Sequence, residues 1–218
     1  MKKSIIIISL LIVITILGIF LYITQNNNSN KNNYISERTN NNQTINTSFN
    51  NTISSPPKEK VTEEIEMAVY STKLSGRDTP RSRNIILTSN TLNGTQINPG
   101  EKFSFCNIVG ICTAEKGYEE ADSFDADGNK VKTLGGGNCQ VSSTIYNVVL
   151  QIPELSVVER HAHSGHVDYV PKDKDAAVSH GSVDFKFKNN LDVPIKLYIY
   201  SDLNGVNARI VKIIEKEV

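Results

Sequence analysis

Cys139 is the residue of this sequence whose surroundings most favour nucleophilic chemistry. It follows Gly135-Gly136-Gly137 and Asn138, and the apolar spacing after it predicts a buried helix over residues 139–151. Free N–H groups and the helix dipole at a helix start favour a thiolate, and the same N–H groups could bind an oxyanion. The glycines would let a substrate backbone approach closely. The alternative is a small hydrophobic core cysteine after an ordinary glycine-rich turn.

Three of the four histidines lie close together, at His161, His163 and His166. A thiolate nucleophile needs a base, usually an imidazole that a third polar group orients. In a strand, His161 and His163 would point the same way, which also suits zinc bound together with Cys139. Neither a Cys-x-x-Cys nor a His-Glu-x-x-His pattern supports a metal, and we expect neither a metal nor a cofactor. The histidines could also be purely structural.

The other two cysteines, Cys106 and Cys112, are six residues apart and flank a plausible turn at Val109-Gly110. Outside the membrane they could form a disulfide, which would leave Cys139 free. The alternative is a pair of reduced, buried thiols.

Secondary-structure patterns predict one α+β domain with a mostly antiparallel sheet around the buried helix that starts at the cysteine. A helix is expected over residues 83–92, and strands over 118–124 and 130–134 form a hairpin through Asp127-Gly128-Asn129. Residues 66–72 fit a strand or the end of a short helix. Further strands are expected at residues 156–160, 167–170, 176–179, 183–188, 195–200 and 206–214.

The N-terminal part reads as a membrane anchor followed by a tether. Residues 5–23 carry no charge, are long enough to cross a bilayer and follow Lys2 and Lys3, so residues 1–24 are predicted to be a signal anchor that leaves the rest of the chain extracytoplasmic. A cleaved signal peptide is the alternative. Twelve asparagines among residues 25–55 predict a disordered linker over 25–60, before a domain over 61–218. The net charge of zero argues against nucleic acid as a partner, and a monomer is expected.

Several blocks of residues resemble the VanW family, which takes its name from accessory genes of vancomycin-resistance clusters. The resemblance covers nearly all of residues 66–200. It rests on the following blocks: Arg83-Asn84-Ile85, Leu92-Asn93-Gly94-Thr95, Pro99-Gly100-Glu101, Phe103-Ser104-Phe105, Gly135-Gly136-Gly137-Asn138-Cys139-Gln140-Val141-Ser142-Ser143-Thr144, Tyr146-Asn147, Glu159-Arg160-His161, His163-Ser164, Tyr169-Val170-Pro171, Asp175-Ala176 and Asp184-Phe185.

This resemblance implies a surface protein of mainly Gram-positive bacteria and an L,D-transpeptidase that cross-links peptidoglycan stem peptides. It implies Cys139 as the nucleophile, His163 as the base with His161 as a further catalytic candidate, and Asp175 or Asp184 as the residue that orients the imidazole. The side chains of Asn138 and Gln140, with the helix-start N–H groups, are the expected oxyanion donors. Further substrate contacts are expected at Gly137, Arg160 and Ser164.

The chain departs from the family pattern at Cys106, Cys112, Ala177 and His166, which are therefore not expected to be catalytic. Two other functions stay open. One is a cysteine peptidase or carboxypeptidase that gives the acyl group to water. The other is a non-catalytic module that binds peptidoglycan or assists glycopeptide resistance.

Overall fold

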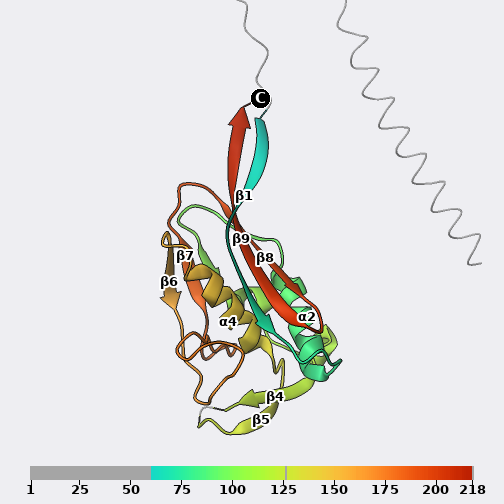
Figure 1. The fold of residues 1–218 in the computed structure, drawn as a ribbon. Helices are drawn as coiled ribbons and strands as arrows, with labels where there is room; N and C mark the ends of the chain where they lie inside the picture. Colours follow the sequence, from blue (N-terminus) through green and yellow to red (C-terminus); the bar gives the residue numbers. More distant parts are fainter. Residues whose placement is uncertain (1–59, 126, 218) are drawn as a thin grey trace, which may run out of the picture. The chain divides into compact units, whose positions relative to one another are not determined.

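The fold is seen in a computed structural model that describes residues 60–125 and 127–217 (Figure 1). These residues belong to a compact unit of residues 57–218. The predicted anchor over residues 5–23 and nearly all of the predicted linker over 25–60 lie outside the described residues. Within the described part of the chain, no helix is both long and apolar enough to cross a membrane.

The largest sheet has four antiparallel strands in the order β1-β9-β8-β2. They are β1 (Lys60–Lys73), β9 (Gly205–Glu217), β8 (Ile195–Ser201) and β2 (Thr95–Ile97). Apolar side chains alternate along β8, where Ile195, Leu197 and Ile199 are buried. One face of this sheet therefore packs against the hydrophobic core.

A second antiparallel sheet has the order β3-β7-β6, from β3 (Lys102–Ser104), β7 (Lys186–Asn189) and β6 (Leu155–Glu159). Phe103 and Phe187 pair across β3 and β7, and their rings stack at 4.8 Å between centroids. The short helix α3 (Phe105–Val109) follows β3 directly, and a 3₁₀ turn, η1 (Ala114–Lys116), follows α3. This sheet supplies the aromatic part of the core.

Two strands, β4 (Glu120–Phe124) and β5 (Lys130–Leu134), form the predicted hairpin (Figure 1). The Asp125 carboxylate closes its turn by accepting the backbone N–H groups of Asp127 and Asn129, each at 2.9 Å. The hairpin pairs with neither of the other sheets.

Two helices complete the unit, α2 (Pro80–Leu92) and α4 (Asn138–Val149). The first begins three residues earlier than predicted, because Thr79 and Ser82 form a capping box and Pro80 occupies the first turn. The second is buried along nearly its whole length and packs against β1 and β9, while α2 packs against β8 and α4. Figure 1 shows α4 beside these strands.

The predicted α+β class with mostly antiparallel pairing is confirmed for the described residues, but two of the predicted strands are wrong. Residues 167–170 and 176–179 form no strand, and β7 begins at Lys186 rather than at Val183. Around residues 176–183 the backbone pairs through isolated bridges, His161 with Ala177 and Ser179 with Val183, and with the Ser143 side chain of α4. Apolar patterning cannot distinguish such a side-chain-held segment from a strand.

Candidate active site

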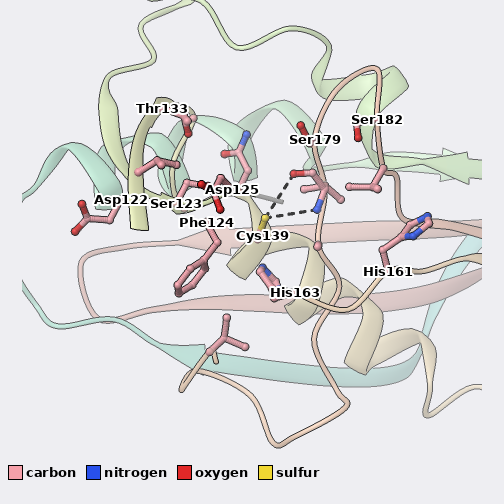
Figure 2. Close-up of a pocket in the computed structure, with 18 of the residues that line it drawn as sticks. Asp122, Ser123, Phe124, Asp125, Thr133, Cys139, His161, His163, Ser179 and Ser182 are labelled. Carbon is pink, nitrogen blue, oxygen red and sulfur yellow. Dashed lines mark hydrogen bonds between the residues drawn. The ribbon is translucent and has the colours of Figure 1, made fainter. Parts of the chain in front are cut away.

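Cys139 lies in a pocket of about 1000 Å³ (Figure 2). The pocket is walled by the first turn of α4, the β4–β5 hairpin and the loop segments at residues 161–169 and 177–183. The Cys139 side chain is half-buried on the first turn of α4. Its thiol donates to the Val178 carbonyl and accepts the Val178 N–H, both at 3.5 Å. The cysteine is thus held at the floor of an open pocket.

The three glycines before Cys139 are explained by packing within the chain. A Cβ on Gly136 would meet the Ala121 carbonyl oxygen of β4, and one on Gly135 would lie 2.8 Å from the Cys112 sulfur. Gly137 has φ +114°, and a Cβ there would lie 2.9 Å from Ile85 of α2. The three glycines thus let α4 begin close against α2 and β4. This packing explains them without a substrate backbone beside them.

His163 stands beside Cys139 and is oriented by Asp175. The imidazole Nδ1 lies 2.6 Å from Asp175 Oδ2, and the His163 side chain is only 7 % exposed. The imidazole shares the pocket with the Cys139 thiol and lies close enough for the thiol to influence its protonation. Burial alone would lower the pKa of His163, but the interactions with Cys139 and with Asp175 outweigh it and raise the pKa above the ordinary value. The order nucleophile, imidazole, carboxylate is that of a cysteine catalytic triad.

The carboxylate of Asp175 is fixed from both sides. Oδ2 accepts the backbone N–H of His163 at 2.6 Å, and Oδ1 accepts Arg160 Nη2 at 2.6 Å. Burial would raise the pKa of Asp175, but these donors and the Arg160 charge lower it, so the carboxylate stays ionised. Arg160 therefore positions Asp175, while its predicted contact with substrate stays a prediction.

The segment that carries Asp175 is held by polar side chains of α4. Asn147 donates to the Lys174 carbonyl at 2.6 Å, Ser142 donates to the Ala176 carbonyl at 2.6 Å, and Ser143 accepts the Ala176 N–H at 2.9 Å. All three side chains are buried. The same helix thus carries the nucleophile and fixes the backbone on both sides of the carboxylate.

Two residues that were expected near the imidazole lie elsewhere. Asp184 contacts Ser104 Oγ and the backbone N–H groups of Cys106 and Phe185, not His163. His161 is exposed, and its Nε2 lies 3.1 Å from Glu159 of β6. His161 thus lines the pocket but its ring binds Glu159, whereas Asp184 binds groups of β3 and α3.

The expected oxyanion side chains are also engaged elsewhere. Gln140 accepts from Arg81 at 2.9 Å and donates to Thr72 Oγ1 and to the Lys73 carbonyl, so it ties α4 to β1. Asn138 accepts from Thr88 at 2.7 Å and donates to the Cys112 sulfur at 3.2 Å. Among the described residues, no acceptor takes the backbone N–H of Cys139 itself.

Ser164 also has a contact within the chain. Its hydroxyl donates to the Asp125 carbonyl at 2.8 Å and so ties the His163 loop to the hairpin, although the residue still lines the pocket.

The predicted disulfide between Cys106 and Cys112 is not formed, and all three cysteines are free thiols. The two sulfurs have different partners, because Cys106 donates to the Val183 carbonyl whereas Cys112 accepts from Asn138. Burial and the charge of Asp184 raise the pKa of Cys106 to about 12, and burial raises the pKa of Cys112. Both side chains nevertheless line the same pocket as Cys139.

Sequence reasoning missed the roles of two residues around the site. Tyr169 places its hydroxyl 3.4 Å from His163 Nε2, and burial raises its pKa, so it remains a neutral hydroxyl. Arg81 lines the pocket with its guanidinium over the Tyr169 ring, 5.9 Å from the centroid. The cap at Thr79 and Ser82, read from the sequence, would have placed Arg81 in the first turn of α2.

Across the described ranges 60–125 and 127–217, no three His, Cys, Asp or Glu side chains are grouped so that they could hold a metal ion. All four histidines of the sequence line the pocket, but only His163 contacts both Cys139 and a carboxylate. The arrangement suits acyl transfer through a thioester, with the imidazole moving protons and the carboxylate holding the ring.

Comparison with known proteins adds a family relation. A family model described as "VanW like protein" matches residues 80–211. Protein YoaR of Bacillus subtilis (strain 168), which is described as uncharacterized, is 38 % identical over 130 residues, 60 % of this chain and 42 % of that protein.

The vancomycin B-type resistance protein VanW of Enterococcus faecalis (strain ATCC 700802 / V583) is 34 % identical over 128 residues, 55 % of this chain and 44 % of that protein. The chain therefore spans less than half the length of each of these relatives. No solved structure matches.

Proposed function

The chain belongs to the VanW family, and from this premise we propose that it is a cysteine L,D-transpeptidase that forms cross-links between peptidoglycan stem peptides. The family relation indicates a role related to the cell wall or to vancomycin resistance, and the Enterococcus relative is named as a resistance protein. The observation that carries the proposal is the position of His163, which lines the same pocket as Cys139 and whose Nδ1 lies 2.6 Å from Asp175 Oδ2.

In the first half-reaction, the Cys139 thiolate attacks the carbonyl carbon between the diamino acid and D-alanine of one stem. The carbon–nitrogen bond breaks, the His163 imidazolium gives its proton to the leaving amine, and D-alanine departs. The backbone N–H of Cys139, which has no acceptor within the described part of the chain, is the donor we assign to the oxyanion in place of Asn138 and Gln140. The product is a thioester on Cys139.

In the second half-reaction, a side-chain amine of a neighbouring stem attacks the thioester carbon. His163 takes the proton of the amine, the carbon–sulfur bond breaks, and the Cys139 thiolate and the His163 imidazolium are restored together with the new amide. The pocket of about 1000 Å³ has room for two extended peptide ends. If water attacks instead, the same site is a carboxypeptidase.

The location is part of the proposal. We propose that residues 1–24 anchor the chain in the membrane, that residues 25–60 act as a tether, and that the domain over 61–218 faces the cell wall as a monomer. The partners would be the lipid bilayer through residues 5–23 and peptidoglycan stem peptides, with no nucleic acid.

The test is intact-mass analysis of the purified chain after incubation with tetrapeptide stems. We expect an adduct with the mass of the tripeptide acyl group on Cys139, release of D-alanine and formation of dimers. Cys139→Ala should lower the rate by at least about 10³-fold. Cys106→Ala is the matched control, because it removes another thiol of the same pocket and should keep the adduct.

The other candidate functions give different products in the same experiment. Shortened monomers without dimers would identify a carboxypeptidase. Peptide binding that Cys139→Ser leaves unchanged, with neither an adduct nor released D-alanine, would identify a non-catalytic module and overturn the proposal.

A further inference from the structure

Arg81 is a cation of the catalytic pocket that lacks an acidic partner. It lines the pocket, but among the described residues no carboxylate lies within 4.0 Å of its guanidinium. Arg83, two residues later on the same helix, is instead bound by Asp78 and Glu119, each at 2.6 Å. Arg160, the arginine on the other side of the site, is bound by Asp175. Arg81 thus differs from both neighbouring arginines in forming no ion pair among the described residues, although its charge helps to lower the pKa of Asp122 across the pocket.

The position of Arg81 is nevertheless fixed by neutral groups. Nη2 donates to Gln140 Oε1 at 2.9 Å, and the guanidinium lies over the ring of Tyr169. Gln140 is in turn held through Thr72 and the Lys73 carbonyl. A guanidinium has five N–H donors, so most of them remain available to a ligand. An arginine that is oriented but not neutralised is suited to a planar anion.

Both contacts of Arg81 lead to the catalytic residues. Gln140 follows Cys139 directly on the first turn of α4. The Tyr169 hydroxyl lies 3.4 Å from Nε2 of His163. The guanidinium therefore stands between the helix that carries the nucleophile and the loop that carries the base, where a group attached to the scissile bond would arrive.

We propose that Arg81 binds the terminal carboxylate of the acyl donor, the carboxylate of the D-alanine that leaves. This inference rests on the proposed function, because it assigns the substrate group to that same site. Three bonds separate this carboxylate carbon from the scissile carbonyl carbon, which keeps the two about 3.5 Å apart. A donor whose carbonyl reaches Cys139 must therefore bring its carboxylate close to the first turn of α4, and Arg81 selects donors that end there.

The experiment compares two tetrapeptide stems that differ only at the C-terminus, one with a free carboxylate and one with a carboxamide. The rate of acyl-enzyme formation on Cys139 is followed by intact mass for the whole chain. The natural sequence should react about 10- to 100-fold faster with the free carboxylate, because a charge-assisted pair is lost with the amide. Arg81→Gln should react with both peptides at nearly equal rates, and Arg81→Lys should give an intermediate ratio.

Lys130→Gln is the matched control, because Lys130 also lines the pocket but lies on the hairpin. If Arg81 alone binds the carboxylate, Lys130→Gln should prefer the peptide with the free carboxylate as strongly as the unchanged protein does. The ratio of two rates in one preparation does not depend on the fraction of folded protein. If Arg81→Gln is inactive with both peptides, the role of Arg81 is judged from two other proteins. The ratio of the rate with the free carboxylate to the rate with the carboxamide is then compared between the unchanged protein and Arg81→Lys.

The outcomes separate the two proposals. Equal rates for both peptides with the natural sequence, or an unchanged ratio in the reactive Arg81 variants, overturn the role of Arg81 and leave the thioester chemistry standing. No adduct with either peptide overturns the proposed function and this inference together.

Discussion

Two aspartates of this molecule are equally buried, at 7 % exposure each, yet they serve different regions. Asp175 lies on the pocket side and accepts from His163 and Arg160. Asp184 lies where β3, α3 and β7 meet and accepts from the Ser104 hydroxyl and from the backbone N–H groups of Cys106 and Phe185. The pocket aspartate thus holds the imidazole that shares the pocket with Cys139, whereas the other one holds local backbone in place beside Lys186, whose Nζ lies 3.6 Å from its Oδ2.

This difference shows that burial and the number of hydrogen bonds do not identify a functional carboxylate. Both aspartates have several donors, and both lie in one of the blocks that resemble the VanW family. What distinguishes them is the chemical type of the donor and its next neighbour. The partner of Asp175, His163, lines the pocket of Cys139, whereas the donors to Asp184 include Ser104 of β3 and Cys106 of α3.

The strongest test of the different roles of Asp175 and Asp184 is to neutralise each aspartate in turn. Asp175→Asn should lower the rate of acyl-enzyme formation by about 10²- to 10⁴-fold, because the imidazole loses the carboxylate that fixes its orientation and stabilises its charged form. Asp184→Asn should keep the rate per folded molecule and lower the free energy of unfolding by about 1–3 kcal/mol. Single-turnover mass analysis and urea unfolding measure the two effects.

Each variant serves as the control of the other, since both remove one buried negative charge from a side chain of the same shape. Equal losses of rate in both variants would show that the Asp175 contact to His163 has no special role. A rate loss that follows only the fraction of unfolded protein would point to the same conclusion.

The sequence allows the regular part of the fold to be predicted well. The helix at Cys139, the hairpin over 120–134 and the last two strands have strong periodicity or turn residues, and the structure has all of them. Strands at 167–170 and 176–179 are predicted wrongly. In the second of these segments the backbone N–H of Ala176 binds the side chain of Ser143 rather than a neighbouring strand. Apolar alternation carries no information about such partners.

For the site, the sequence allows Cys139 and His163 to be named but cannot choose between Asp175 and Asp184. That choice depends on Ser142, Ser143 and Asn147, which bind the segment around Asp175 to α4 over a separation of about 30 residues. The contacts of Asn138 and Gln140 within the chain could not be predicted for a similar reason. Their neighbours in the sequence are catalytic candidates, but their side chains bind Thr88 and β1.

A second prediction concerns the titration of His163. Asp175 and Cys139 raise the pKa of His163 above its ordinary value of 6.5, whereas burial opposes them. In NMR titrations, the pKa of the His163 ring should therefore fall in Asp175→Asn and stay unchanged in Asp184→Asn. A fall in both variants, or in neither, would contradict the assignment of the two aspartates.

The same shift predicts the pH dependence of stability. Because the folded state binds the proton more tightly than the unfolded state, His163 stabilises the fold below pH 6.5, and this contribution disappears as the pH rises through the folded pKa. His163→Gln should therefore lose more free energy of unfolding at pH 6 than at pH 9. Urea unfolding at both pH values measures this difference, and His161→Gln is the matched control on the exposed side of the loop.

The smallest expected effect concerns the thiols of the two regions. Burial, together with the charge of Asp184, raises the pKa of Cys106 to about 12 from 9.0, so at pH 9 only about one Cys106 in 10³ is a thiolate. Iodoacetamide at that pH should therefore label Cys139 while Cys106 stays unlabelled, as peptide mass analysis can show. Asp184→Asn removes the charge but leaves the burial, so it should raise the labelling of Cys106 only about 3- to 10-fold. Asp175→Asn should leave that labelling unchanged, because Asp175 does not act on Cys106. A rise in the labelling of Cys106 in Asp175→Asn would mean that both aspartates act on the same thiol. The division into two separate regions would then be wrong.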